Sequence, residues 1–188
     1  MAPSRVADVG VQYYVASSID GFIAAPGDDL EWLLQFGMDE FQPHFDRFIA
    51  DVGAIVMGSS SYEFILAEGD DAWAYGSIPT WVLTTRRLPT VPAADIRFVS
   101  GEVGSVVADA RGAAGARNVW VVGGGATAAQ VADAGLLDEL HLTVMPVLLG
   151  KGTPLLPVAS TLGPLRLVRS TPFPSGAIEL VYALGSSG

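Results

Sequence analysis

The sequence contains no cysteine, so disulfide bonds, thiol catalysis and cysteine-ligated metal sites are excluded. Basic residues are scarce: 10 Lys and Arg stand against 20 Asp and Glu, which gives a formal net charge of −10. An acidic chain without a basic run is a poor partner for nucleic acid or for an anionic membrane surface. Any anionic ligand must therefore be bound locally, by helix ends and a few well-placed bases.

Long apolar runs and histidine clusters are also missing. No stretch approaches the roughly 20 apolar residues that span a membrane, so the cytoplasm is the expected location. The only histidines, His44 and His141, stand alone without the spacing of metal ligands, and no metal site is expected.

Hydrophobic residues make up 50% of the chain, whereas charged residues make up only 16%. This composition is typical of a compact enzyme or binding domain and argues against disorder. A chain of 188 residues is long enough to bury a real core. We interpret it as one domain over residues 1–188, with a core from about 9 to 184.

Hydrophobic periodicity predicts strands and helices in alternation. Strand patterns occupy residues 9–17, 54–57, 81–84, 96–99, 119–122, 140–145, 165–169 and 178–184. Helical patterns occupy residues 28–33, 41–52, 103–114 and 127–134, and another follows residue 58. Asp28 with Glu31, and Ser60 with Glu63, have the spacing of capping boxes. The order predicts an α/β fold with a mixed sheet, crossover helices and an antiparallel C-terminal end.

The chain is organised around a glycine turn that follows an apolar strand. The strand ends at Val122, residues 123–125 are all glycine, and a helical pattern follows. A turn without side chains at a helix start leaves backbone N–H groups free at the sheet edge, which suits a phosphate. An ordinary tight turn that needs glycine dihedral angles is an equal alternative for this motif alone.

The same turn matches the loose dinucleotide fingerprint G-x-G-x-x-A from Gly123 to Ala128. A Rossmann unit would carry an acidic residue at the end of the next strand, where residues 142–144 are Leu, Thr and Val. The context therefore argues against a Rossmann fold.

Two further strand ends carry residues that suit a phosphate. Residues 58–61 are Gly-Ser-Ser-Ser at a helix start, and residues 84–87 are Thr-Thr-Arg-Arg. Taken singly, ordinary capping is favoured for the first, and a solvated turn is an equal alternative for the second. Because ligands of open α/β sheets bind at the carboxyl ends of the strands, three such turns together favour a nucleotide cleft.

Two charged residues are candidates for contact with a substrate. Asp29 lies in the first turn of a helix, where pairing with the helix dipole is the ordinary explanation. The functional interpretation is a partly buried carboxylate that faces the substrate and either binds an amidine-like edge or relays a proton. Lys151, the only lysine, is either simply exposed or in contact with a substrate phosphate.

Six segments occur in a fixed order: residues 18–24 (SIDGFIA), 29–33 (DLEWL), 56–63 (VMGSSSYE), 82–86 (VLTTR), 121–125 (VVGGG) and 148–152 (LLGKG). Together they resemble the dihydrofolate reductase-like superfamily. The most similar branch is the reductase domain of the riboflavin-biosynthesis bifunctional deaminase-reductase and its stand-alone relatives. The resemblance extends over roughly residues 9 to 184.

The resemblance implies a three-layer fold with a central, mostly parallel eight-stranded sheet, flanking helices and antiparallel C-terminal strands. It also implies NADPH as hydride donor, a homodimer, and Asp29 as the match of the substrate-facing acid of dihydrofolate reductase. The implied cofactor contacts run from the nicotinamide (Ala16, Ile19, Gly21) to the pyrophosphate (Val122, Gly123, Gly124, Gly125, Ala126, Thr127), the adenine-side phosphates (Gly58, Ser59, Ser60, Ser61) and the 2′-phosphate (Thr84, Thr85, Arg86).

Two departures from the family pattern bear on specificity. Ser59 stands where the family commonly has an arginine, which weakens the expectation of NADPH over NADH unless Arg86 or Arg87 compensates. The family's zinc-binding deaminase domain has no counterpart in these 188 residues, so a riboflavin-pathway substrate does not follow.

The leading hypothesis is an NADPH-dependent reductase of a small heterocyclic substrate, either pteridine- or pyrimidinone-like. Asp29 or a water molecule would supply the proton. A non-catalytic nucleotide-binding or dimerisation module of the same fold is the second hypothesis, because Ser59 replaces an arginine and the role of Asp29 as the acid is not established by its sequence context. Dihydrofolate reductase itself is the third, although the sequence lacks the aromatic pattern of its substrate pocket.

Overall fold

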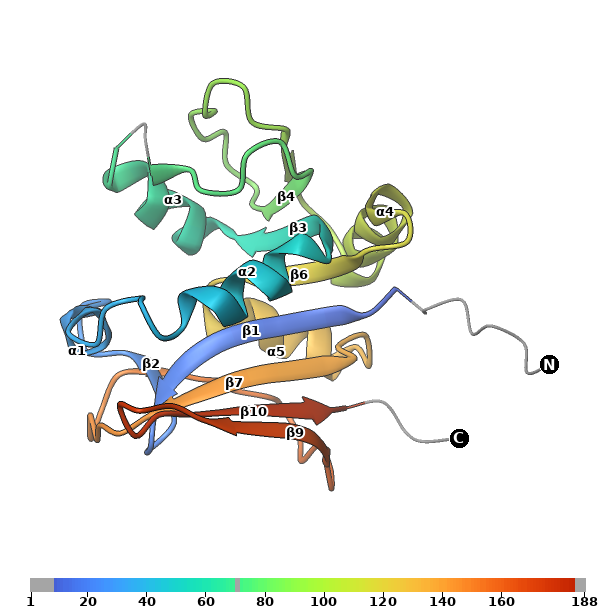
Figure 1. The fold of residues 1–188 in the computed structure, drawn as a ribbon. Coiled ribbons are helices and arrows are strands. Elements are labelled where there is room, and N and C mark those ends of the chain that lie inside the picture. Colours follow the sequence, from blue (N-terminus) through green and yellow to red (C-terminus); the bar gives the residue numbers. More distant parts are fainter. Residues whose placement is uncertain (1–8, 70–71, 185–188) are drawn as a thin grey trace.

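The computed structural model describes residues 9–69 and 72–184, so the ends of the expected domain, 1–8 and 185–188, lie outside it. The strands of the main sheet are β1 (Val11–Ser18), β3 (Val52–Gly58), β4 (Thr80–Leu83), β5 (Ile96–Val99), β6 (Asn118–Val122), β7 (Glu139–Met145), β9 (Arg166–Pro172) and β10 (Ile178–Ala183). These eight strands lie in the order β5-β4-β3-β6-β1-β7-β10-β9. Neighbours are parallel from β5 to β7, whereas β10 and β9 are antiparallel to their neighbours (Figure 1).

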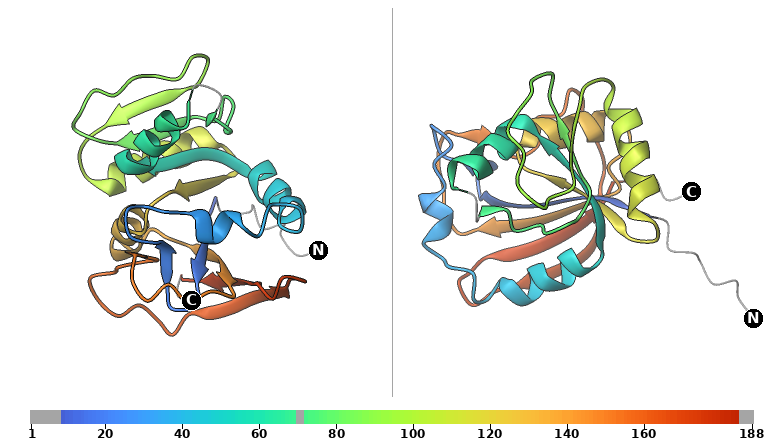
Figure 2. Two further views of the ribbon diagram at one scale, coloured as in Figure 1. Left: turned by 90° about the vertical axis from the view of Figure 1, so that its left-hand side faces the viewer. Right: turned by 90° about the horizontal axis from the view of Figure 1, so that it is seen from above.

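Helices cover both faces of this sheet (Figure 2). They are α1 (Glu31–Leu34), α2 (Gln42–Ala50), α3 (Ser59–Ala67), α4 (Val103–Ala114) and α5 (Gly125–Asp133). Side chains of α4 and α5 pack with Tyr13 and Val121 on one face. Side chains of α2 and α3 pack with Ile55 and Trp120 on the other. The three-layer α/β fold expected from the resemblance is therefore confirmed.

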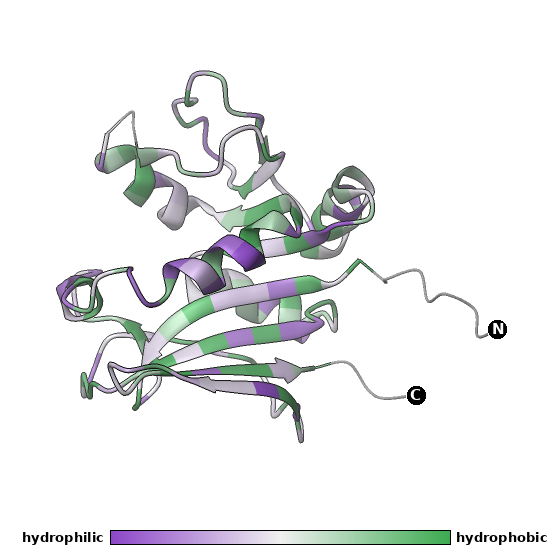
Figure 3. Cartoon of the chain, viewed as in Figure 1, coloured by the Kyte–Doolittle hydropathy of each residue, from purple (hydrophilic) through white to green (hydrophobic). Residues whose placement is uncertain are grey.

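The central strands are apolar because helices shield both of their faces. All residues from Val52 to Met57 in β3 are buried, as are those from Val119 to Val122 in β6. Helix α2 lies nearer the solvent and carries both hydrophilic and hydrophobic residues (Figure 3). The turns that follow β3 and β6 thus start from the best-packed part of the molecule.

The sequence patterns did not predict one short pair of strands. β2 (Phe22–Ala24) and β8 (Thr153–Pro154) form a separate antiparallel pair. Strands of three and two residues are too short to show an alternating pattern, so their pairing depends on tertiary contacts. Helix α5 also begins at Gly125, two residues before the expected start at Thr127.

Both predicted capping boxes are wrong. Helix α1 has Leu30 as its N-cap, and the Asp28 carboxylate instead accepts a hydrogen bond from the Thr153 hydroxyl at 3.3 Å. Helix α3 starts one residue before Ser60, with Gly58 as N-cap and no side-chain capping bond. Neither helix start therefore has the side-chain cap that the sequence spacing predicted.

None of the helices in the described part of the chain combines the length and apolar character needed to cross a membrane.

Candidate functional site

The three turns selected from the sequence lie at one edge of the sheet. Strands β4, β3 and β6 are adjacent and parallel, and Met57 is in register with Val82 on one side and Val122 on the other. The serine turn after β3, the threonine-arginine turn after β4 and the glycine turn after β6 therefore emerge side by side. This part of the prediction is confirmed, and the cause is the parallel topology.

The glycine turn is packed directly against the start of α3. The backbone N–H of Gly124 donates a hydrogen bond to the Ser61 hydroxyl oxygen at 3.1 Å. Gly123 has φ of 104°, and a Cβ on this residue would overlap the Ser61 side chain. A Cβ on Gly58 would likewise overlap the Thr127 hydroxyl of α5. Glycine is required at both positions for the two helix starts to approach each other.

These two helix starts have no side-chain caps. The N-caps of α3 and α5 are Gly58 and Gly124, and neither helix has a side-chain capping bond. Apart from the Gly124 N–H, which donates to the Ser61 hydroxyl, each N-terminus leaves N–H groups and the positive end of a helix dipole without a side-chain cap. A Cβ on Gly124 would meet no protein atom within 4 Å, whereas one on Gly125 would overlap the Pro154 and Leu155 carbonyls, so the start of α5 is open on the Gly124 side. Paired, uncapped helix ends beside open space fit a pyrophosphate.

The third turn is only partly available to a phosphate. The Arg86 guanidinium binds both carboxylate oxygens of Glu63, at 2.8 and 2.6 Å, and lies 3.4 Å from the Ser59 hydroxyl. The Arg86 backbone N–H donates to the Thr84 hydroxyl oxygen at 3.0 Å, while Thr85 is exposed. Glu63, expected to cap α3, thus pairs with the arginine expected at the 2′-phosphate.

The expected nicotinamide end lies where β1 leaves the sheet. Ala16 is in β1, and the Ile19 backbone N–H donates to the Val147 carbonyl at 2.8 Å. Gly21 has φ of 85° and closes the turn with an N–H bond to the Ser18 carbonyl at 3.1 Å. These residues border the loop after β7, one strand away from β6 and its glycine turn.

Asp20 holds this turn to the loop after β7. Its carboxylate accepts hydrogen bonds from the Ser18 hydroxyl at 2.6 Å and from the backbone N–H groups of Leu149 and Gly150 at 3.0 and 2.6 Å. These bonds, led by that from Ser18, lower the pKa of Asp20 from 3.8 to about 2. No sequence pattern singles out this role of Asp20, because Gly150 and Leu149 lie about 130 residues away in the chain.

An apolar cavity of about 180 Å³ opens beside this turn, between α1, α2 and strands β1 and β7. Its lining residues are Tyr14, Ala16, Leu33, Leu34, Gly37, Met38, Phe41, Phe45, Thr143 and Met145. Ala16 therefore connects the expected nicotinamide position with a hollow that can accept a substrate. Except for Ala16, the lining was not identified from the sequence, because its members come from four elements and share no motif.

Asp29 does not lie in this cavity's lining. It is exposed, and its carboxylate accepts a hydrogen bond from the Glu31 backbone N–H at 2.8 Å. The expectation of a partly buried carboxylate is therefore wrong. Its local contact is the ordinary one for an acidic residue at a helix start.

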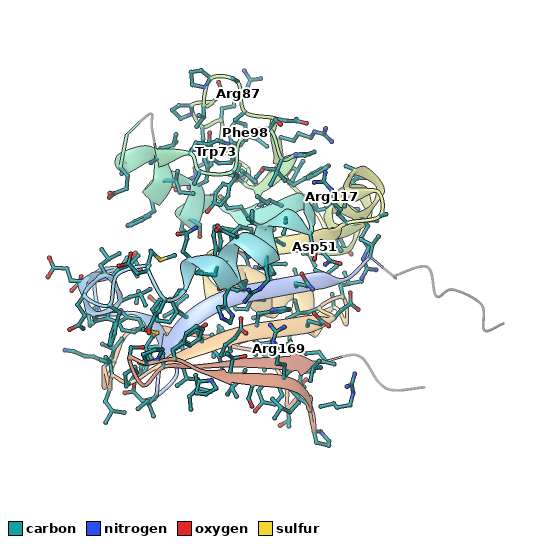
Figure 4. The ribbon with its side chains drawn as sticks, in the orientation of Figure 1. Asp51, Trp73, Arg87, Phe98, Arg117 and Arg169 are labelled. Atoms are coloured by element: carbon teal, nitrogen blue, oxygen red, sulfur yellow. The ribbon has the colours of Figure 1, made fainter. Side chains whose placement is uncertain are left out.

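A second, polar cavity of about 270 Å³ lies at the other end of α2. It is lined by Gln12, His44, Arg47, Phe48, Asp51, Asn118, His141, Arg169 and Glu179, of which Asp51 and Arg169 are labelled in Figure 4. The buried Glu179 carboxylate accepts from Arg169 at 3.0 Å and lies 3.6 Å from His44. Gln12 and Asn118 belong to the amino-terminal ends of β1 and β6, so this cavity is separate from the glycine turn.

Within residues 9–69 and 72–184, no three histidine, aspartate or glutamate side chains are grouped to hold a metal ion.

Comparison with known proteins identifies relatives over almost the whole chain. Residues 10–178 match the family model described as RibD C-terminal domain. The chain is 27% identical to the uncharacterized protein YwjB of Bacillus subtilis, over 90% of this chain and 94% of that protein. A solved Shewanella structure, whose name connects it to riboflavin biosynthesis, shares 25% identity with a TM-score of 0.80. The match covers 95% of this chain and 100% of that one.

More distant structures share the fold. A Thermotoga maritima deaminase and 5-amino-6-(5-phosphoribosylamino)uracil reductase matches with a TM-score of 0.69 and 13% identity, over 95% of this chain and 57% of that one. Dihydrofolate reductase from Enterococcus faecalis, solved with NADP(H), matches with a TM-score of 0.67 and 15% identity, over 94% of this chain and 97% of that one.

Proposed function

The chain belongs to the RibD C-terminal domain family, and from this premise we propose that it is an NADPH-dependent reductase of a small heterocyclic compound. The observation that carries the proposal is the contact between two uncapped helix starts, at Gly58 and Gly124, at the edge that also holds the apolar cavity. This edge of the sheet therefore offers a site for the cofactor pyrophosphate and, beside it, a cavity for the ring of the substrate.

In the proposed complex, the N–H groups at the starts of α3 and α5 bind the phosphates. Ala16, Ile19 and Gly21 border the nicotinamide ring, which supplies a hydride when the cofactor is bound. The chain's own residues hold the acceptor against that ring and exclude water with apolar side chains. Orientation and electrostatics would then supply most of the acceleration.

We assign the proton that follows the hydride to water, because Asp29 is exposed and lies outside the cavity lining. Asparagine also caps helices well, so Asp29→Asn should keep the hydrogen bond to Glu31 while it removes the acidic group. We expect turnover with the best substrate of a pterin and pyrimidinone panel, and the affinity for NADPH, to change little. A fall in turnover on the order of 100-fold would contradict this assignment and make Asp29 the proton donor.

Titration with NADPH, followed by tryptophan fluorescence, tests the proposal. We expect saturable binding, which Gly124→Ala weakens at least about tenfold because its methyl group enters the phosphate seat. Gly124 has φ of −64°, so alanine is tolerated and the melting temperature should hardly change. Gly112→Ala, at an exposed position in the last turn of α4, is the matched control and should leave affinity unchanged. No saturable binding at millimolar NADPH would refute the proposal.

A further inference from the structure

The apolar cavity has a restricted polar chemistry. Its only side-chain polar atoms within the described residues are the hydroxyls of Tyr14 and Thr143, and no Lys, Arg, His, Asp or Glu lines it. Aromatic rings of Tyr14, Phe41 and Phe45 and the thioethers of Met38 and Met145 form most of the wall. Such a surface stabilises a flat apolar ring and offers one or two hydrogen bonds.

An anionic group on the substrate has no partner in this cavity. Moving a carboxylate or phosphate from water into apolar surroundings is costly unless a cation or several hydrogen bonds replace its hydration. The bases of the neighbouring elements lie elsewhere: Arg47 of α2 and Arg169 of β9 line the polar cavity at the other end of α2. Arg86 is paired with Glu63 of α3 and does not line the apolar cavity. Lys151 is exposed and does not line it either.

The cavity is also small. Its volume of about 180 Å³ lies below the roughly 300 Å³ at which drug-sized ligand pockets begin. A compact mono- or bicyclic ring fits this description, whereas a ring that carries a sugar phosphate would have to leave its larger part outside.

We propose that the substrate of this reductase is an uncharged, flat, compact ring compound without a phosphate or other anionic group, whose C=O or C=N bond faces the hydroxyls of Tyr14 and Thr143. This inference rests on the proposed function and sets the substrate class of the same site. With the reduced nicotinamide dinucleotide bound, its hydride would add to the carbon of that bond, and the oxygen or nitrogen would take one proton from water. The products are the reduced ring and the oxidised cofactor.

Tyr14 is suited to donate a hydrogen bond to such a group. Burial and the Glu179 carboxylate raise its pKa to about 12 against a smaller lowering by Arg169, so the hydroxyl keeps its proton at neutral pH. Tyr14 also packs against Phe48 with ring centroids 4.5 Å apart, which fixes the ring under α2. It is a binding residue that the sequence alone did not single out.

Pterin and 6-carboxypterin provide a matched pair of probes, since they share the ring and differ by one carboxylate. With the NADPH-bound protein at pH 7, we expect pterin to bind at least about tenfold more tightly, because the carboxylate loses its hydration without gaining a cation. Tyr14→Phe should weaken pterin binding severalfold while NADPH binding stays unchanged.

A gain-of-function variant keeps the test independent of folding. Met38 lines the cavity and is 53% exposed, so Met38→Lys places a cation at the rim without disturbing the core. It should raise the affinity for 6-carboxypterin at least about fivefold and reduce the preference for pterin. Ser100→Lys, an equal charge change at an exposed site beyond β5, should change neither affinity.

The two proposals fail in different ways. If NADPH binds but 6-carboxypterin binds as tightly as pterin, or neither pterin binds at millimolar concentration, the substrate inference is overturned and the reductase proposal stands. If NADPH itself does not bind, the reductase proposal fails.

Discussion

At the scale of single residues, the ion pair between Arg86 and Glu63 bears on how the 2′-phosphate of the proposed cofactor would bind. Arg86 is the base expected at the 2′-phosphate, and Glu63 occupies both of its terminal nitrogens. Ser59, within 3.4 Å of the same guanidinium, adds a hydroxyl but no charge. A 2′-phosphate must therefore compete with a carboxylate that belongs to the protein.

We predict that Glu63→Gln raises the preference for NADPH over NADH by about tenfold, because Arg86 is released for a charge-assisted bond to the phosphate. Affinities for both cofactors, measured by fluorescence titration, give the ratio. Glu68→Gln makes the same change of charge at the C-cap of the same helix and should leave the ratio unchanged. An equal increase in both variants would assign the effect to net charge alone.

Asp20 is the second residue whose role depends on distant partners. Its folded-state pKa of about 2 lies below the ordinary 3.8, so its hydrogen bonds stabilise the folded state fully above about pH 4. This stabilisation is lost as the pH falls through 2, because the carboxylate then takes up a proton.

We predict that Asp20→Asn lowers the free energy of unfolding at neutral pH, and that the difference from the natural protein shrinks between about pH 4 and pH 2. Urea unfolding over a pH series measures this difference. Asp109→Asn, at an exposed site of α4, serves as control. A difference that does not depend on pH would show that charge on Asp20 is irrelevant to stability.

At the scale of elements, the contact between the starts of α3 and α5 is the central feature of the site. It requires glycine at 123, because this residue has φ of 104° and its α-carbon faces the Ser61 side chain. The hydroxyl of Tyr13, in the neighbouring strand β1, donates a hydrogen bond to the Gly123 carbonyl at 3.1 Å and so stabilises the turn. The turn therefore combines a positive φ, which glycine adopts without strain, with close packing.

We predict that Gly123→Ala destabilises the protein by about 2 kcal/mol or more, through strain at positive φ and overlap with Ser61. The melting temperature should fall by roughly 4–8 °C for a domain of this size. Gly112→Ala, in a helix with open space around it, should stabilise by about 0.5–1 kcal/mol. Equal melting temperatures for the two variants would contradict the packing argument.

At the scale of the whole molecule, the sheet ends in an unprotected edge. β9 is the last strand of the order, and Leu167 and Val168 are 49% and 48% exposed there. An edge strand with exposed apolar residues is a natural template for pairing with another chain. We propose that this edge forms the homodimer that the family resemblance implies.

Light scattering should then give a mass near twice 19.6 kDa at micromolar concentration. Val168→Lys should shift the protein toward the monomer, because charge on an edge strand opposes pairing. Ser100→Lys, beyond the opposite edge of the sheet, should leave the mass unchanged. A monomeric natural protein would refute the homodimer, and a dimer insensitive to Val168→Lys would exclude this edge.

Local chemistry determined much of what the sequence revealed. Buried strands such as Val52–Gly58 and the helix Val103–Ala114 were predictable, because hydrophobic periodicity is a local property. The glycine and serine turns were found for the same reason, since each is a contiguous run between a strand and a helix. The resemblance then placed these pieces in the correct three-layer fold.

The tertiary structure alone decided which side chains share a space. Glu63 pairs with Arg86 and makes no capping bond at the N-terminus of α3. The Asp29 carboxylate accepts a hydrogen bond from the Glu31 backbone. The apolar cavity collects Tyr14, Met38 and Thr143 from separate elements. These contacts depend on strand order and on helix packing between residues far apart in the chain, so no local sequence pattern predicts them. The turns of the proposed phosphate site were therefore predictable from the sequence, whereas the lining of the apolar cavity was not.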